Sequence, residues 1–260
     1  MALEVKKIYV DSRYRTADSV DDNDFKIHLA RNIYLPEKWV MHIENIVMSH
    51  SWYSIEENIN DIIYVKLGDS LNITRQIPSN NYTGASLAAT LANALGNGFV
   101  VLYDLNKNRF TISNTQTFKI LTDSELATGL NNTFGVSYNR SSPNSCNDII
   151  TNKVVNSGTT FVSGMLNLNG FRALYISSST LSSYNTLGAK GENNIIKKVP
   201  VNADFGYICV DQHVSDHDFL PVERMTLNTI DFQVRDVKGN LIPFHGSPIS
   251  FTIVFSLQDK

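Results

Sequence analysis

The chain has 260 residues, a hydrophobic share of 42% and a formal net charge of −3, which together are typical of a globular protein with a buried core. Direct binding to nucleic acid is not expected, because the phosphate backbone requires concentrated Lys and Arg and this chain has no such cluster. No apolar run reaches the roughly 18 residues that span a bilayer, and residues 1–7 lack the apolar core of a signal peptide, so we expect a soluble protein without a membrane span that stays inside the cell making it.

Residues 1–24 are predicted to form an N-terminal arm that leads into the fold. After the short apolar stretch 8–10 comes a cluster that is our candidate partner interface: Asp11, Arg13, Tyr14 and Arg15. The two guanidinium groups are suited to form bidentate hydrogen bonds with carboxylates of a neighbouring subunit, and the tyrosine could pack against that subunit as an amphipathic anchor. A solvated turn stabilised by Asp11 explains the same residues equally well.

Alternating polarity predicts three strands within residues 25–68. Phe25–Leu29 alternates apolar and polar side chains, and Asp61–Leu67 is predicted as a further strand. Trp39–Ser51 alternates until its phase slips at Asn45, where the strand stays hydrophobic. A slip of one residue without loss of hydrophobicity predicts a β-bulge.

The character of the sequence changes for the next hundred residues, 69–168. Leucines recur at helical spacing in Gly84–Leu95, with Thr83 as the expected N-cap and Gly96 as the stop, so this segment is predicted to be a helix. Two alternating runs, 99–104 and 109–114, follow as a predicted hairpin. We interpret the whole region as an insertion, in which a helix packs on a small sheet and loops follow.

Long strands resume at residue 169 and continue to the end of the chain. They are Phe171–Ser178, Ile195–Val201, Phe205–Val210, Met225–Val237 and Ile249–Leu257. These bring the predicted strands outside the insertion to eight, each with one apolar face that must be covered by a second sheet. We therefore predict an all-β domain, made of residues 25–68 and 169–260, with antiparallel strands in two sheets. Eight is the jelly-roll count, although a simple sandwich or an open barrel fits the same alternation.

Sequence motifs of catalysis are absent. The chain has no G-x-S-x-G, H-E-x-x-H, P-loop or paired C-x-x-C pattern. Cys146 and Cys209 are interpreted as free thiols. We accordingly predict no catalytic residue, no enzyme activity and no cofactor.

One polar connection carries possible metal ligands: His213, Asp216 and His217. Imidazoles and carboxylates can hold a divalent cation. Two histidines four residues apart share a face only on a helix, however, and these lie between strands, so a solvated loop is the simpler interpretation. A metal at this loop would make the chain a cupin-like metalloenzyme, which is the minor alternative.

Several segments, taken together, carry a family resemblance. They are residues 10–13 with 23–29, 82–104, 174–176, 199–206 and 241–252. In their order and spacing the chain resembles the penton, or minor capsid, proteins of virophages and of Polinton-like (Maverick) viruses.

The resemblance implies a single jelly roll with a small α+β insertion between its third and fourth strands. It implies a homopentamer that forms the fivefold vertex of an icosahedral double-stranded DNA virus or virus-like element and contacts the major capsid protein. Such a protein resides in the virion and is made and assembled inside the host cell. The N-terminal arm would reach a major capsid subunit, so we expect that deleting residues 1–20 leaves the fold intact but prevents incorporation into the vertex.

A second function is compatible with the same fold. The insertion would project outward, where it could meet a host-surface glycan or receptor. The alternative reading is therefore a carbohydrate-binding jelly roll used in host attachment, with exposed aromatic residues such as Tyr53 and Tyr138 at the sugar site.

Overall fold

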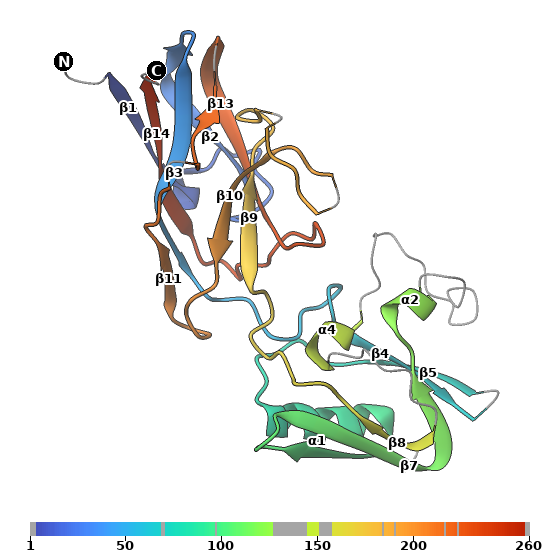
Figure 1. Cartoon of the computed structure of the whole chain (residues 1–260). Helices are drawn as coiled ribbons and strands as arrows, with labels where there is room; N and C mark the ends of the chain where they lie inside the picture. The colour runs from blue at the N-terminus through green and yellow to red at the C-terminus, as the bar shows by residue number, and fades with distance from the viewer. Residues whose placement is uncertain are drawn as a thin grey trace. The chain divides into compact units, whose positions relative to one another are not determined.

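The computed structural model describes residues 4–68, 71–96, 98–126, 145–150, 158–183, 185–189, 191–215, 217–222 and 224–257. The chain divides into two compact units (Figure 1). The first combines Met1–Trp52 with Phe171–Lys260, and the second is Tyr53–Gly170. Each unit has its own hydrophobic core.

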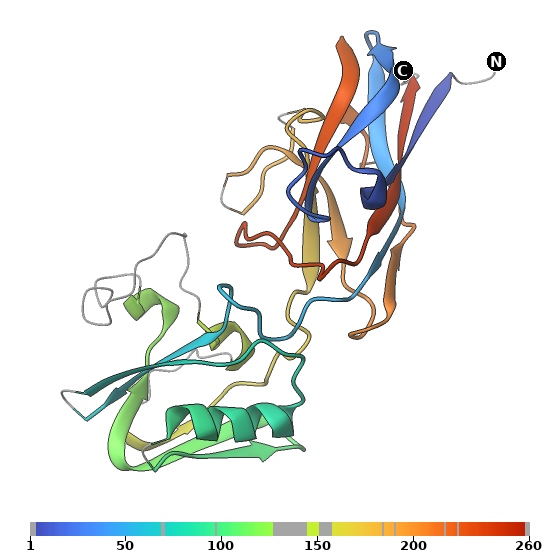
Figure 2. The same ribbon diagram turned by 180° about the vertical axis from the view of Figure 1, so that it is seen from behind.

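The first unit is a sandwich of two antiparallel sheets (Figures 1 and 2). Its strands are β1 (Val5–Asp11), β2 (Asp24–Leu35), β3 (Trp39–Ser49), β9 (Ala173–Ser177), β10 (Ile195–Pro200), β11 (Ile208–Asp211), β12 (Leu220–Pro221), β13 (Met225–Arg235) and β14 (Ile249–Leu257). The first sheet has the order β1-β14-β3-β11, with the short β12 also pairing with β3. The second has the order β10-β9-β13-β2.

This strand order is that of a jelly roll. Successive strands lie in opposite sheets except at β9 with β10 and at β11 with the short β12, and the first and last strands lie side by side. The long alternating segments β13 and β14 therefore do not form a hairpin, because the chain between them crosses from one sheet to the other. The all-β sandwich predicted from the sequence is confirmed.

Alternation along β14 builds the core between the sheets. Ile249, Phe251, Ile253 and Phe255 point inward and are each at most 3% exposed. They face side chains of the second sheet, where the ring of Phe232 meets that of Phe251 edge-on at 5.1 Å between centroids. Full burial of one such side chain stabilises the fold by about 1.5–3 kcal/mol, so these facing rows hold the sandwich closed.

The predicted β-bulge in β3 is confirmed. Asn45 has a left-handed backbone, with φ of 54°, and the register with β14 shifts beside it. Ile43 and Ile46 consequently both point into the core, while Val47 is turned to the outer face of the sheet.

The N-terminal segment differs from the predicted arm. Residues 5–11 form β1, which pairs along its whole length with β14, and Ile8 and Val10 are buried in the sandwich core. The short helix η1 (Ser12–Tyr14) follows directly. A three-residue apolar stretch between Lys7 and Asp11 is a weak strand signal, because only two of its side chains reach the core.

The boundary of the insertion also differs from the sequence interpretation. Residues 53–68 belong to the second unit, since β4 (Ile62–Leu67) pairs with strands of that unit and Ile63 and Val65 lie in its core. Alternation indicates a strand but does not identify its partner. Because β1 takes the place of this strand in the sandwich, the insertion still lies between the third and fourth jelly-roll strands, β3 and β9.

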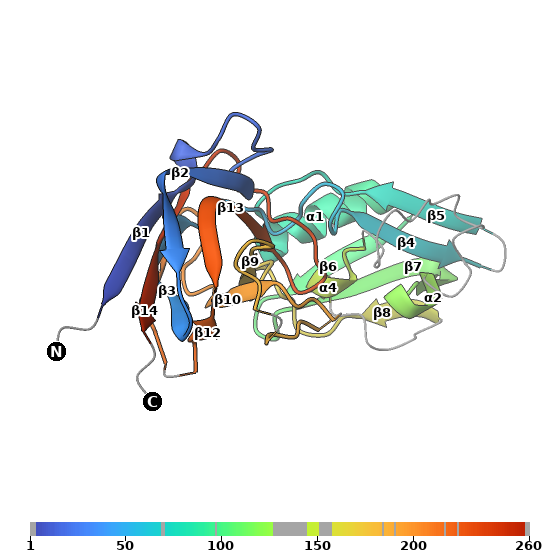
Figure 3. The same cartoon turned by 90° about the horizontal axis from the view of Figure 1, so that it is seen from above.

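The second unit is a helix packed on a small sheet (Figure 3). Besides β4 it contains β5 (Leu71–Gln76), α1 (Gly84–Leu95), β6 (Val100–Asp104), β7 (Arg109–Ile120), α2 (Asp123–Glu125), α4 (Asn147–Ile150) and β8 (Gly158–Val162). The predicted helix is confirmed with both ends: Thr83 caps its start through a reciprocal bond with Ser86, and Gly96 ends it with φ of 55°.

Candidate assembly interface

The outer face of the first sheet gathers side chains from four strands that are far apart in the sequence. Asp11, Ser250, Val47 and Val210 stand opposite one another across β1, β14, β3 and β11. One step along the sheet, Ile208 lies opposite Ser49. The bulge at Asn45 is what brings Val47 into this row.

An apolar patch is exposed on this face. We call its members, Tyr9, Val47, Ile208 and Val210, the outer-face patch. Tyr9 is 79% exposed and Ile208 is 61% exposed, while the two valines are 38% and 39% exposed. Exposed apolar groups clustered on one sheet face are characteristic of contact surfaces between proteins, and aromatic side chains are enriched in them.

A shallow hollow adjoins the outer-face patch. It has a volume of about 470 Å³, part of it open to solvent, and Asp11 and Arg13 line it together with Val47, Ile208 and Pro248. At its rim the guanidinium group of Arg13 donates from Nε to Asp11 Oδ1 at 2.9 Å and from Nη2 to Oδ2 at 2.6 Å. This hydrogen bonding holds the pKa of Asp11 below its usual range, so the rim of the hollow carries a fixed ion pair.

The other members of the predicted interface cluster lie next to this hollow in the chain. Arg15 donates from Nη1 to Asp22 Oδ1 at 2.6 Å, and Asp22 also accepts a hydrogen bond from Ser12 at 2.8 Å. Both arginines are thus paired within their own chain, which matches the turn interpretation of these residues. Tyr14 is 81% exposed and is the cluster member most available to a partner. Sequence spacing could not show that Asp22 folds back onto Arg15.

A charged strip crosses the same face beside Tyr9. Lys7 Nζ donates to Glu44 Oε1 at 2.9 Å, and this bond raises the pKa of Lys7 and lowers that of Glu44. His42 lies with Nε2 at 3.7 Å from Glu44 Oε2 and packs edge-on against Phe219, at 4.7 Å between ring centroids. Burial lowers the pKa of His42, which favours its neutral form.

Asp218, a carboxylate next to the possible metal ligands in the same loop, is paired with a lysine. Asp218 accepts a hydrogen bond from Lys197 Nζ at 3.0 Å, and the same ammonium group donates to the backbone oxygen of His213 at 2.9 Å. His217 donates its backbone N–H to Ser215, and Asp216 lies outside the described residues. The described part of the chain contains no group of three or more His, Cys, Asp or Glu side chains arranged to hold a metal ion.

The remaining predictions about single residues fall in different places. Cys146 and Cys209 are both buried free thiols, as expected. Tyr53 is half-buried, and Tyr138 lies outside the described residues. Of the helices in the described ranges, none is long and apolar enough to cross a membrane.

Sequence reasoning missed the outer-face patch, although one signal was present. Residues 207–210, Tyr-Ile-Cys-Val, are apolar without alternation. Cys209 points into the core at 1% exposure, so Ile208 and Val210 must point outward. An unbroken apolar run in a strand with only one buried face predicts exposed apolar side chains.

These features define a single jelly-roll protein with an α+β insertion and an exposed apolar sheet face. No family model and no curated protein matches the chain. Among solved structures, the chain is similar to the mavirus penton protein, whose crystal structure was determined with selenomethionine. The match covers 96% of this chain and 99% of that chain, with 10% identity and a TM-score of 0.46.

Proposed function

We propose that this chain is a structural minor capsid protein, five copies of which form the vertex of an icosahedral double-stranded DNA virus or virus-like element. The observation that carries the proposal is the outer-face patch on a jelly-roll sandwich, because a sheet face directed permanently to water is expected to be polar. The dispersed sequence segments that resemble penton proteins support the same role. In this proposal the protein resides in the virion, is assembled inside the host cell and contacts the major capsid protein.

Ring closure follows from a contact between two different flanks of neighbouring copies. Such a head-to-tail contact closes into a ring when its rotation suits the copy number. We assign one flank to the outer-face patch and its hollow, with Tyr14 as an anchor beside it. A standard contact covers about 800 Å² of each partner, so two of them would cover a small part of the 13697 Å² surface of the chain.

The charged groups on this flank would set the orientation of the contact more than its strength. An exposed ion pair such as Asp11–Arg13 adds little stability by itself. At an interface, complementary charges select the partner and fix the register of the contact. Lys7 with Glu44 provides a second fixed pair on the same face.

The second unit would serve contacts outside the ring, with a host-surface receptor or glycan. Its strands β6, β7 and β8 present an uncharged row, in which Leu102 and Val162 stand on either side of Thr111. Leu102 is 62% exposed and Val162 is 43% exposed. An uncharged, partly apolar strand face is suited to contact with another macromolecule.

Substitution of Ile208 tests the flank that we assign. We expect the wild-type chain to sediment as a closed oligomer and Ile208→Glu to sediment as a monomer, because a carboxylate would be desolvated inside the contact. Leu187→Glu is the matched control, since Leu187 is 82% exposed on the same unit and lies outside the patch. A wild-type chain that is monomeric at every concentration, or an oligomer unaffected by Ile208→Glu, would contradict the proposal.

A further inference from the structure

One edge of the sheet in the second unit is open to pairing with another strand. The strand β6 is the last in the order β5-β4-β7-β6, so only one of its two edges is bonded to a neighbouring strand (Figure 3). Unpaired backbone groups along a strand edge are a template for a further strand. Such an edge is complementary to an extended polypeptide, because its donors and acceptors alternate at the spacing of a second strand.

The pairing of β7 shows which backbone groups of β6 point to the free edge. The backbone oxygen of Phe110 in β7 accepts a hydrogen bond from the N–H of Ser163, at 2.9 Å, on the side of β8. In an antiparallel pair, opposite residues either bond to each other or both point away. Tyr103 lies opposite Phe110, so its N–H and C=O point away from β7. Those of Val101, two residues earlier in the strand, do the same.

Val101 and Tyr103 therefore each offer an N–H and a C=O to a ligand. Within the described ranges, no other backbone group is bonded to them. Their side chains hold the edge in place: Val101 is buried in the core of the second unit, and the ring of Tyr103 packs edge-on against Phe110, at 6.0 Å between centroids. The same ring lies over Gly84 at the start of α1, where a Cβ atom would be only 2.3 Å away. An edge that is fixed before binding loses less entropy when a ligand pairs with it.

Other strands at sheet edges carry features by which proteins prevent edge pairing, such as charged side chains and proline. They include Lys6 and Lys7 in β1, Lys26 in β2, Arg75 in β5 and Pro200 in β10. In β11 the backbone oxygen of Val210 is already bonded to Asn202 Nδ2 at 2.9 Å. By contrast, Val100–Tyr103 of β6 is uncharged and lacks proline, and its register with β7 is unbroken.

Exposed apolar side chains lie along the same edge. Val100 is 50% exposed and Leu102 is 62% exposed, and both alternate with the side chains that face α1. Leu102 belongs to the uncharged row with Thr111 and Val162 that we assign to contacts outside the ring. A strand added at β6 would place one of its own side chains beside Leu102, and apolar cross-strand pairs of this kind stabilise a sheet.

We propose that the free edge of β6 binds an extended segment of a partner protein by β-strand addition. The N–H and C=O groups of Val101 and Tyr103 would bond to the backbone of that segment, and Leu102 would contact an apolar side chain of it. In this mode of recognition the main chain supplies affinity and the side chains supply specificity. The inference rests on the proposed role of the second unit in contacts outside the ring, and it selects a polypeptide as the partner in place of a glycan.

A synthetic peptide tests the edge on the full chain. The probe is acetyl-Lys-Thr-Ile-Thr-Val-Lys-amide, whose isoleucine lies opposite Leu102 when its threonines bond to Val101 and Tyr103. We expect saturable binding of the labelled peptide in fluorescence anisotropy. We also expect the peptide to slow hydrogen–deuterium exchange in residues 100–104.

Methylated peptides separate strand addition from other modes of binding. N-methylation of both threonines should weaken binding about tenfold or more, because it removes the N–H groups that face β6. N-methylation of the isoleucine is the matched control. Its N–H points away from β6, so the affinity should change far less.

Variants of the chain test the same edge. Leu102→Lys should weaken binding of the peptide about tenfold or more, because a lysine on an edge strand opposes strand addition. Leu105→Lys adds the same charge and is the matched control, since Leu105 is 76% exposed in the turn after β6. Its affinity should be unchanged. Melting temperatures show whether each variant is folded.

Absence of binding would overturn the proposal, because the backbone of an extended peptide supplies the required groups. Equal binding by the peptide methylated at its threonines, or by Leu102→Lys, would also overturn it. A particle of twice the ring's mass that disappears in Leu102→Lys would show that a second copy occupies the edge instead of a partner. Peptide binding does not depend on the copy number, so a chain that binds the peptide but forms no ring contradicts only the assembly proposal.

Discussion

At the residue scale, we expect the partly buried His42 to make the stability of the first sheet sensitive to acid. The ring is 9% exposed, and its Nδ1 atom has no hydrogen-bond partner among the described residues. Glu44 on its own strand favours the charged ring, whereas Lys7 from β1 and Lys197 from β10 oppose it. Burial is the largest effect and lowers the pKa of His42 from its ordinary value of 6.5.

The free energy of unfolding should therefore depend on pH through this residue. Below pH 6.5 the unfolded chain takes up a proton at His42 before the folded chain does, so acid favours unfolding until the pH falls below the folded-state pKa. We expect His42→Leu to lose less stability than wild type between pH 7.5 and pH 5.5 in urea titrations. Burial also lowers the pKa of His50. Because His50 is present in both proteins, its contribution to the pH dependence is the same in each and cancels in the comparison. Equal losses would show that His42 is not the sensitive group.

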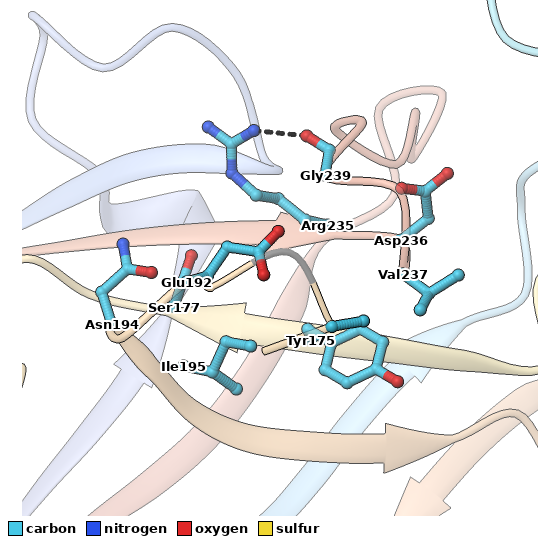
Figure 4. A pocket seen from close by; sticks show the side chains of 10 residues that line it. Tyr175, Ser177, Glu192, Asn194, Ile195, Arg235, Asp236, Val237 and Gly239 are labelled. Atoms are coloured by element: carbon cyan, nitrogen blue, oxygen red, sulfur yellow. Dashed lines mark hydrogen bonds between the residues drawn. The ribbon is translucent and has the colours of Figure 1, made fainter. Parts of the chain in front are cut away.

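The roles of single residues were only partly predictable from the sequence. The β-bulge at Asn45 was foreseeable, because the hydrophobic phase changes at that residue. The pairing of Arg15 with Asp22 was not, since it depends on how the chain turns between β1 and β2. Tyr175, Glu192 and Arg235 line one shallow depression of the sandwich (Figure 4) although they are far apart in the sequence, and no local pattern indicates that they meet.

At the scale of elements, β1 is an integral strand of the sandwich. Deletion of residues 1–20, expected from the sequence to spare the fold, should instead expose the edge of β14 and open the core. Substitution tests the same point without shortening the chain. We expect Ile8→Ala to cost about 2 kcal/mol of stability, at the low end for a buried isoleucine because the strand lies at an edge.

Tyr9→Ala is the matched control for this strand. Tyr9 neighbours Ile8 but points to solvent, so its loss should change the free energy of unfolding by less than about 0.5 kcal/mol. Urea denaturation midpoints compare the two variants. If Ile8→Ala were as stable as Tyr9→Ala, β1 would be an arm that merely rests on the sheet.

Elements whose signals are local were predicted well, and those defined by distant partners were not. The helix α1 carries its own start and stop in Thr83 and Gly96, so both ends were correct. Residues 61–67 have the alternation of a sandwich strand, but their partners are β5 and β7 of the second unit. The pairing of β1 with β14 joins opposite ends of the sequence, which no window along the chain can reveal.

At the scale of the whole molecule, the insertion should be removable. Each sheet lies within one unit, and the rings of Trp52 and Phe171, where the chain leaves and re-enters the sandwich, are 6.3 Å apart. A Gly-Ser linker of about four residues spans about 11 Å. We therefore expect a chain with residues 53–170 replaced by such a linker to fold.

Calorimetry and near-ultraviolet circular dichroism check this prediction. The shortened chain should unfold in one cooperative transition and keep the signals of the buried Trp39 and Trp52. A chain without a cooperative transition would show that the sandwich requires the insertion for its stability.

Native mass spectrometry of the full chain tests the assembly proposal most directly, because it counts the copies. The proposal predicts a complex of five copies, with a mass near five times 29.1 kDa, that is lost in Ile208→Glu and kept in Leu187→Glu. If the wild-type chain were detected only as a monomer, or as a complex of another copy number, the assignment of the outer-face patch to a fivefold ring would be contradicted.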